Sequence, residues 1–304
     1  MNEIYRTKEG ELISRDAWVK KVEELKRAVK KEEEITNKDE AEKILTEKIN
    51  KAIIKRKSKK ENAVLFSGGI DSTIIAYLLK RKNAGVKCYT VGTEQSQDVK
   101  YAKIIAEEYN LQIKIRIVNN DEIKQAVEEV TNILNTDNKV EIAIGTTEYL
   151  AMEMLKKDRI RNVFTGLGSE EIFAGYRRHL QAKESGMDIN EACWEGLITT
   201  YDRDFIREDK LSRYFKIEER TPFLDEELIK TAMRIDGRLK IKGKIKKYIL
   251  RKVAQRIGLK EEYAMRPKKA AQYGSRINRE VMKILNKPPH LILRKLLNQK
   301  RQKE

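Results

Sequence analysis

Cysteine and histidine are scarce in this sequence, with two residues of each among 304. Cys88 and Cys193 lie far apart and form no CxxC pair, which argues against a disulfide scaffold, a zinc finger and a two-cysteine sulfur-transfer site. His179 and His290 leave little room for a histidine metal cluster. A metal centre built from cysteine and histidine is therefore not expected.

Long apolar runs and a signal peptide are also missing. No run approaches the ~18–20 apolar residues of a membrane span, so we expect a cytoplasmic protein with no membrane partner. Acidic residues are outnumbered, because 65 Lys and Arg face 48 Asp and Glu, for a net charge of +17. This excess suits an anionic partner such as a nucleotide or RNA, although most of these side chains are typical of ordinary solvated surface.

One stretch combines a buried-strand pattern, a glycine turn and a helix start. It reads Ala63-Val64-Leu65-Phe66-Ser67-Gly68-Gly69-Ile70-Asp71-Ser72-Thr73. Backbone N–H groups at such a turn, together with the helix dipole, form an anion site that suits a triphosphate or pyrophosphate. A carboxylate facing phosphates needs a cation between them, so Asp71 is a candidate magnesium ligand. The alternative is a plain strand-turn-helix corner in which Asp71 caps the helix.

Apolar periodicity predicts the remaining organisation. We expect helices at 16–34, 39–57, 97–109, 121–134 and 146–155, and strands at 63–66, 86–91, 112–118 and 162–165. This alternation predicts an α/β fold, with a parallel sheet covered by helices on both faces. Beyond about residue 172 the strand signals fade, and the remainder reads mainly as helix. The expected units are a helical extension over 1–58, the main domain over 59–285 and a basic tail over 286–304.

Ligands of parallel sheets gather at the carboxyl ends of the strands, so the loops at 67–72, 92–98 and 166–171 are expected to meet. The third loop belongs to a second motif, which reads Thr165-Gly166-Leu167-Gly168-Ser169-Glu170-Glu171-Ile172-Phe173-Ala174-Gly175-Tyr176. Its glycines allow the backbone to approach a nucleotide, and Glu170 is placed to share a magnesium ion with Asp71. The alternative is that acids simply favour the first turn of a helix.

The string SGGIDS resembles the pyrophosphate loop of the PP-loop ATP pyrophosphatases, which cleave ATP between the α- and β-phosphates and adenylate a substrate. It is not a Walker loop, because Gly243-Lys244 is followed by Ile245. The second motif and the strings at 97–102, 220–225 and 247–252 are similar to the synthetase domain of glutamine-hydrolysing asparagine synthetases. β-Lactam synthetases share this architecture, and the resemblance covers about residues 40 to 275.

The resemblance implies an ATP site and a magnesium site. The pyrophosphate end of ATP would be held by Ser67, Gly68, Gly69, Asp71 and Ser72. The adenine and ribose side would be lined by Leu65, Val91, Thr165 and Gly166. Asp71 and Glu170 would bind Mg²⁺, and Lys247 would reach the α-phosphate as charge builds there. Periodicity alone would make Lys247 a surface lysine.

Two departures from the family pattern affect the predicted chemistry. Asn2 follows Met1 where the family has the nucleophilic cysteine of a glutaminase domain, so ammonia from solution, a separate glutaminase or another amine donor is expected. Leu167 stands where the family has a glutamate beside the reacting acyl group. An apolar side chain cannot accept a proton or bind an amine, which leaves the product open but does not affect the ATP chemistry.

The expected activity is that of an AMP-forming amide ligase, in which a carboxylate, with aspartate as the first candidate, attacks the α-phosphate of Mg-ATP. One alternative is a PP-loop enzyme that adenylates a tRNA or RNA base, which the net charge favours. RNA would then contact the lysines at 55–60 and the tail at 294–303, with strongly salt-dependent affinity. A third interpretation is a nucleotide-binding subunit without catalytic activity.

Overall fold

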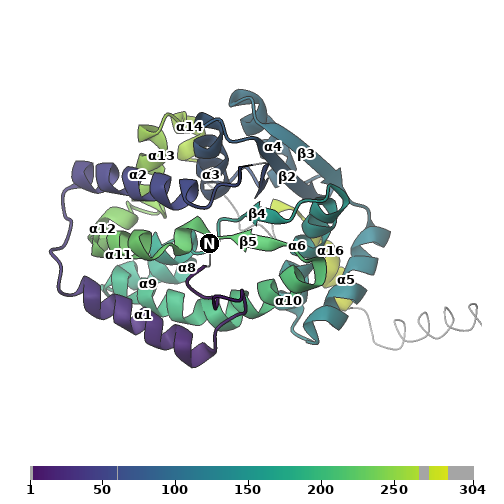
Figure 1. Ribbon diagram of the computed structural model, residues 1–304, viewed down its shortest axis with the longest axis horizontal. Helices are drawn as coiled ribbons and strands as arrows, with labels where there is room; N and C mark the ends of the chain where they lie inside the picture. The colour runs from purple at the N-terminus through teal and green to yellow at the C-terminus, as the bar shows by residue number, and fades with distance from the viewer. Residues whose placement is uncertain (1–2, 60, 267–273, 287–304) are drawn as a thin grey trace, which may run out of the picture.

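The computed structural model describes residues 3–59, 61–266 and 274–286, and its centre is a parallel sheet (Figure 1). The strand order is β3-β2-β1-β4-β5, and every neighbouring pair is parallel. The strands are β1 Asn62–Leu65, β2 Val86–Gly92, β3 Gln112–Ile117, β4 Asn162–Phe164 and β5 Glu218–Arg220. The chain moves outward from β1 to β3 and then returns to the other side of β1 for β4. A topological switch point therefore lies between β1 and β4, where such sheets bind ligands.

Helices cover both faces of the sheet, as the sequence predicts. Successive residues of a strand point to opposite faces, and Ala63 and Val64 accordingly enter two different hydrophobic clusters. The cluster on the Val64 side contains α3 Ile70–Arg81 and α4 Gln97–Glu108. The cluster on the Ala63 side contains α5 Asn120–Leu134, α6 Lys139–Lys157 and α16 Ile277–Leu285. The predicted α/β class is confirmed.

Three elements differ from the sequence prediction. Helix α1 Arg15–Val29 ends at Val29 rather than at 34, because the residues at 30–34 are all charged and offer no apolar side chain to bury. Strand β5 was not expected, because Glu218-Glu219-Arg220 has no apolar residue, yet it pairs with β4 at the sheet edge. Helix α6 begins at Lys139 rather than at 146, because the Asn138 side chain accepts hydrogen bonds from two backbone N–H groups of the first turn.

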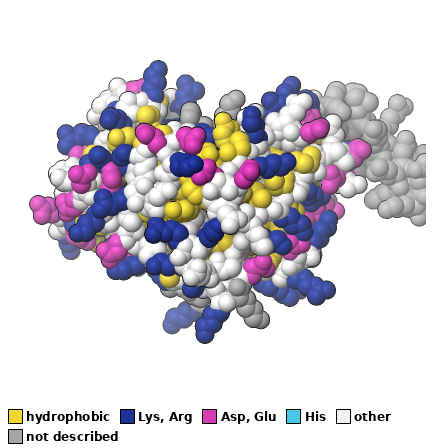
Figure 2. Space-filling view, turned by 90° about the horizontal axis from the view of Figure 1, so that it is seen from above, with side chains coloured by type: hydrophobic (Ala, Val, Ile, Leu, Met, Phe, Trp, Pro, Cys, Tyr) yellow, Lys and Arg dark blue, Asp and Glu magenta, His cyan; other side chains and the backbone are white. Residues whose placement is uncertain are grey.

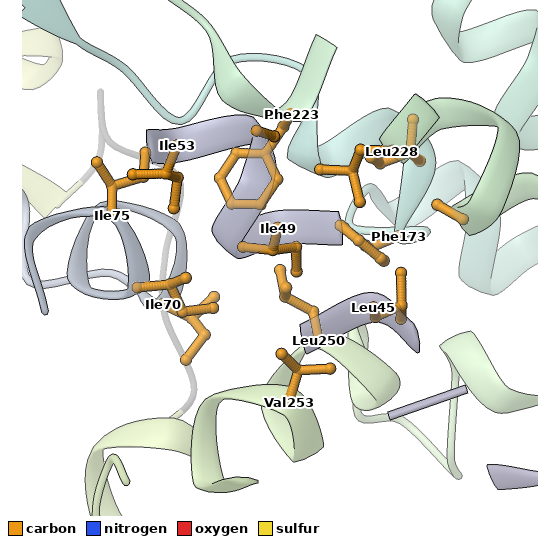
Figure 3. Packing of buried hydrophobic residues seen from close by; sticks show 14 of the residues in the cluster. Leu45, Ile49, Ile53, Ile70, Ile75, Phe173, Phe223, Leu228, Leu250 and Val253 are labelled. Carbon is orange, nitrogen blue, oxygen red and sulfur yellow. The ribbon is translucent and has the colours of Figure 1, made fainter. Parts of the chain in front are cut away.

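The first two helices pack into the same cluster as the sheet. Helix α2 Lys38–Ile54 lies against α13 Tyr248–Arg256, and its residues Leu45, Ile49 and Ile53 lie in the cluster shown in Figure 3. Helix α1 Arg15–Val29 packs on α9 Ile189–Thr200. There the buried Trp18 indole N–H donates to the Leu197 carbonyl at 2.9 Å. Apolar burial therefore joins these helices to the central layer.

The chain after β4 is mainly helical, as expected. The remaining elements are α7 Ser169–Ile172, α8 Arg177–Glu184, the π-helix η1 Tyr201–Phe205, α10 Ile206–Phe215, the 3₁₀ helix η2 Pro222–Leu224, α11 Glu226–Arg234, α12 Gly237–Lys240 and α14 Glu261–Ala264. Within the described ranges, no helix has the length and apolar character needed to span a membrane. Apart from Asn286, the predicted tail at 286–304 lies outside the described residues.

Candidate active site

The turn between β1 and α3 is shaped to receive an anion. Gly68 has a φ of +61°, and a Cβ atom there would lie 2.9 Å from the backbone nitrogen of Ala102 in α4. Gly69 is the N-cap of α3, and no side chain caps this helix. Among the described residues no side chain is recorded as accepting from its first N–H groups, and free N–H groups at a helix N-terminus are the arrangement that binds phosphates. The Ser72 hydroxyl donates to the Gly69 carbonyl at 3.2 Å, which stabilises the turn.

The loop that follows β4 reaches the same place. A Cβ atom at Gly166 would lie 3.0 Å from the Cβ atom of Asp71, so the two loops pack directly on each other. Gly168, with a φ of +91°, packs equally closely on Leu224. The loops at 67–72 and 166–171 thus meet at the switch point, as predicted. The third loop, 92–98, borders the segment at 274–275, where the Ser96 hydroxyl donates to the Gly274 carbonyl at 3.1 Å.

Lys247 lies between these two loops. Its Nζ atom is 2.9 Å from each carboxylate oxygen of Asp71, 2.6 Å from Oε1 of Glu170 and 3.0 Å from Oγ of Ser169. Only 4% of the residue is exposed. Asp71, Glu170 and Lys247, which the sequence assigned to metal and phosphate, therefore form one cluster from three distant segments.

The Lys247 ammonium is kept charged by its neighbours. Burial lowers the pKa of Lys247, but the nearby Asp71 and Glu170 carboxylates outweigh burial and raise the pKa above its usual value. Lys247 also has a φ of +54° at the N-cap of α13, a conformation that costs energy for a residue with a Cβ atom. A buried, fully protonated cation at a strained position is characteristic of a functional site.

Gly175 provides the space that this cluster needs. A Cβ atom at this position would lie 1.7 Å from Oε2 of Glu170 and 2.4 Å from Cε of Lys247. Any larger residue would therefore push the two charged side chains from their positions.

Glu171, unlike Glu170, forms no ion pair with Lys247 and instead forms hydrogen bonds inside the protein. It is buried, and its Oε1 atom accepts hydrogen bonds from the Tyr176 hydroxyl at 2.8 Å and from the Arg203 guanidinium of η1. Burial, with a further contribution from Asp204, raises the pKa of Glu171. These contacts anchor the loop of Glu170 to the π-helix.

The residues predicted to line the adenine side lie side by side at the carboxyl-terminal ends of the central strands. Leu65, Val91 and Thr165 lie at the carboxyl ends of β1, β2 and β4, and the Thr165 N–H donates to the Arg220 carbonyl at 3.0 Å. Val91 and Thr165 are buried, and Leu65 is half-buried. They remain predicted nucleotide contacts, together with Gly166.

Part of the basic turn at 55–60 is used inside the fold. Arg56 is buried and pairs with Glu3 at 2.8 Å and with Asp225 at 2.9 Å. Lys55 also contacts Asp225. These two cations therefore have partners within the chain, whereas Lys57 and Lys59 are exposed.

Two arginines near the turn at 67–72 had no predicted role. Arg266 donates to the Gly68 carbonyl at 2.7 Å, and its guanidinium lies 3.9 Å from the centre of the Tyr101 ring. Arg251 donates to the Ala264 carbonyl at 2.6 Å and to the Arg266 carbonyl at 3.0 Å, which holds this segment in place. Arg266 and Gly68 are 198 positions apart, so no local pattern signals the contact.

Comparison with known families agrees with this geometry. A sequence model of the family described as asparagine synthase matches residues 44–188 and 182–304. The chain belongs to the asparagine synthase family. A Methanocaldococcus jannaschii protein named as a putative glutamine-hydrolysing asparagine synthetase is 28% identical over 288 residues, which cover 82% of this chain and 52% of that protein. A Lotus japonicus asparagine synthetase is 33% identical, over 66% of this chain and 37% of its own length. The chain spans about half or less of these curated relatives.

Solved structures give weaker similarities. An NH3-dependent NAD synthetase from Campylobacter jejuni has 16% identity and a TM-score of 0.32, covering 78% of this chain and 100% of its own. An NMN synthetase from Francisella tularensis has 11% identity and a TM-score of 0.33, and the match covers 82% of this chain and 94% of that chain. Similarities of this strength carry no argument about function.

The carboxylates of this family member fit a magnesium ion that is shared with ATP. Mg²⁺ in nucleotide enzymes takes one or two carboxylates and completes its shell with phosphates and water. Asp71 and Glu170 come from two loops, and both carboxylates contact the Lys247 ammonium. They are therefore close enough to each other to supply two ligands to one metal ion. Among the described residues, no group of three or more Asp, Glu, His or Cys could hold a metal without the nucleotide.

Proposed function

We propose that this chain is an ATP-dependent, AMP-forming amide ligase. A substrate carboxylate oxygen attacks the α-phosphorus of ATP, the bond to the bridging oxygen of the β-phosphate breaks, and pyrophosphate leaves. An amine nitrogen then attacks the acyl carbon, loses a proton, and AMP leaves. The observation that carries the proposal is the buried Lys247 ammonium, held by Asp71, Ser169 and Glu170 at the switch point of the sheet.

The geometry supports separate tasks for the two loops. The uncapped N-terminus of α3 would hold the β- and γ-phosphates, which become pyrophosphate. A fixed cation next to that site would stabilise the negative charge that develops on the α-phosphoryl group, and preorganised charge of this kind is usually the largest single contribution to catalysis. Asp71 and Glu170 would hold Mg²⁺, which when bound neutralises the phosphate charge.

The acceptor step is where this chain departs from its relatives. Leu167 is half-buried and packs against the main hydrophobic cluster, and its backbone N–H lies 3.5 Å from the Thr165 hydroxyl. No acid stands at this position to accept a proton from an incoming amine. Aspartate is the first carboxylate to test, and ammonia, supplied free or by a separate glutaminase, is the first amine.

Pyrophosphate release tests the proposal. The full chain is incubated with Mg-ATP and, in separate reactions, with aspartate plus ammonium, with other amino acids plus ammonium, and with total tRNA. We expect AMP and pyrophosphate in equal amounts, only with an amino acid present, and about 10²–10³-fold slower release from a Lys247→Ala variant. Release that depends on tRNA would instead support the RNA-modifying alternative. ATP binding without release under any condition would support the non-catalytic one.

A further inference from the structure

A second cavity lies away from the Asp71–Lys247 cluster, between α2, α3 and α13. Its volume is about 380 Å³, which is within the usual range of small-molecule sites, roughly 300–1,000 Å³. One wall is the face of α2 that carries Lys43, Glu47 and Asn50, which are spaced at helical intervals. The opposite wall is formed by the C-terminal ends of α3 and α13.

The lining of this cavity is strongly basic. Lys43, Arg81, Lys82 and Arg256 line it, and Glu47 is the only acid among the lining residues. Glu47 is already paired with Lys51 at 2.5 Å. Within the part of the chain that the structure describes, Lys43, Lys82 and Arg256 form no ion pair within 4 Å. Figure 2 shows basic and acidic side chains interspersed over one face of the molecule.

The cavity is distinct from the proposed ATP site. Helix α3 begins at the pyrophosphate turn and ends at Arg81, so at ~1.5 Å per residue Asp71 and Arg81 are separated by about 15 Å of helix. Helix α13 likewise begins next to Lys247 and ends at Arg256. Arg81 links the C-terminal ends of α3 and α13, because its guanidinium donates to the Ile257 carbonyl at 2.7 Å.

We propose that this cavity binds a small phosphate-bearing anion, of the size of a nucleotide or a phosphorylated metabolite. Lys43, Lys82 and Arg256 are exposed at the rim of this space and form no ion pair within 4 Å among the described residues, so they can supply the charge-assisted hydrogen bonds that phosphate oxygens accept. The cavity is half open to solvent, and its size suits a small ligand, whereas a polymer would need a continuous basic track. The proposal does not depend on the activity of the Lys247 site.

The test uses inorganic tripolyphosphate as the probe, titrated calorimetrically onto the full chain at low salt. The variant is Lys82→Glu/Arg256→Glu. It reverses the charge at the C-cap of α3 and the charge of one residue in the last turn of α13. The matched control is Arg27→Glu/Lys30→Glu, which makes the same changes in the last turn and at the C-cap of α1. Circular dichroism and urea unfolding establish that both variants are folded.

We expect the first variant to lose one class of binding sites, with affinity reduced by about tenfold per reversed charge, while the control keeps it. Any binding of the probe at the ATP site would persist in both variants, so a failed ligase assay would not affect this result. Absence of binding in the wild type, unchanged binding in the variant, or equal loss in variant and control would overturn the proposal. A short oligouridylate that binds far more tightly than tripolyphosphate at the same residues would overturn the small-ligand class in favour of RNA.

Discussion

Replacing Lys247 by alanine should reduce the chemical rate far more than the affinity for ATP. Its ammonium is fixed by Asp71, Glu170 and Ser169 before any substrate binds, so little reorganisation is needed as charge develops on the α-phosphate. Loss of one preorganised donor of this kind costs about 2.7–4 kcal/mol in the transition state. We therefore expect kcat to fall by about 10²–10³-fold, with a much smaller change in the KM for ATP.

The same change should also destabilise the fold. Without the ammonium, the Asp71 carboxylate, whose side chain is 18% exposed, is left without its buried cation. Removing one partner of a buried ion pair costs about 3–5 kcal/mol. Glu170 is 39% exposed, so solvent screens its charge and it adds little to this loss. The strain at φ +54° is unchanged, because alanine and lysine both carry a Cβ atom.

The assay is steady-state pyrophosphate release, combined with urea unfolding at pH 7. Lys247→Met, which keeps most of the aliphatic stem, separates the loss of charge from the loss of packing and should be as slow as the alanine variant. Lys244→Ala, at an exposed position of the same segment, should behave like the wild type. A folded Lys247→Ala protein that turns over at the normal rate but binds ATP more weakly would show that Lys247 is a ground-state contact.

Four further predictions concern Asp71, Gly175, Leu167 and Asp158. Asp71→Asn should abolish pyrophosphate release in a folded protein, because the metal loses a charged ligand; near-normal turnover would contradict the metal assignment. Gly175→Ala should lower kcat by about 10²-fold, since its Cβ atom displaces the reacting charges; unchanged kinetics would show that the cluster adapts. Leu167→Glu should increase asparagine formation from aspartate, ATP and ammonium by roughly 10²–10⁴-fold, the contribution of a positioned base. Efficient synthesis by the wild type would show that leucine is no obstacle. Hydrogen bonds from Lys114, Lys87 and Tyr89 hold the pKa of Asp158 down to about 2, so this carboxylate stabilises the fold above its unfolded pKa near 4. The stability lost in Asp158→Asn at pH 7 should therefore disappear as the pH falls from 4 to 2, and a constant difference in urea unfolding would refute this linkage.

The sheet and the helices around it could be predicted because their signals are local. The predicted strands are apolar-rich runs or, at 112–118, an alternation of apolar and polar residues, and each helix repeats apolar residues at three- and four-residue steps. Strand β5 carries no such signal: Glu218-Glu219-Arg220 is polar throughout, and the strand forms because the exposed edge of β4 supplies hydrogen-bonding partners. The early start of α6 was missed because Gly145 interrupts an otherwise helical pattern.

The site could be predicted only where a string of residues carries it. The turn at 67–72 has its own chemistry, so its place at the switch point follows from the sequence. Lys247 was found through family resemblance, because a lysine in a basic amphipathic segment is usually exposed. Arg266 and Gly175 act through contacts with distant parts of the chain, and only the folded arrangement reveals them.

The packing of α1 on α9 provides a built-in optical probe. The chain has two tryptophans, Trp18 on α1 and Trp194 on α9, and both are buried in the same cluster. Tryptophan emission therefore reports the separation of these two helices, whereas far-ultraviolet circular dichroism follows the backbone of the whole chain. If the two signals change at the same urea concentration, the helices before residue 58 unfold together with the sheet. If emission shifts first, those helices form an independently unfolding extension.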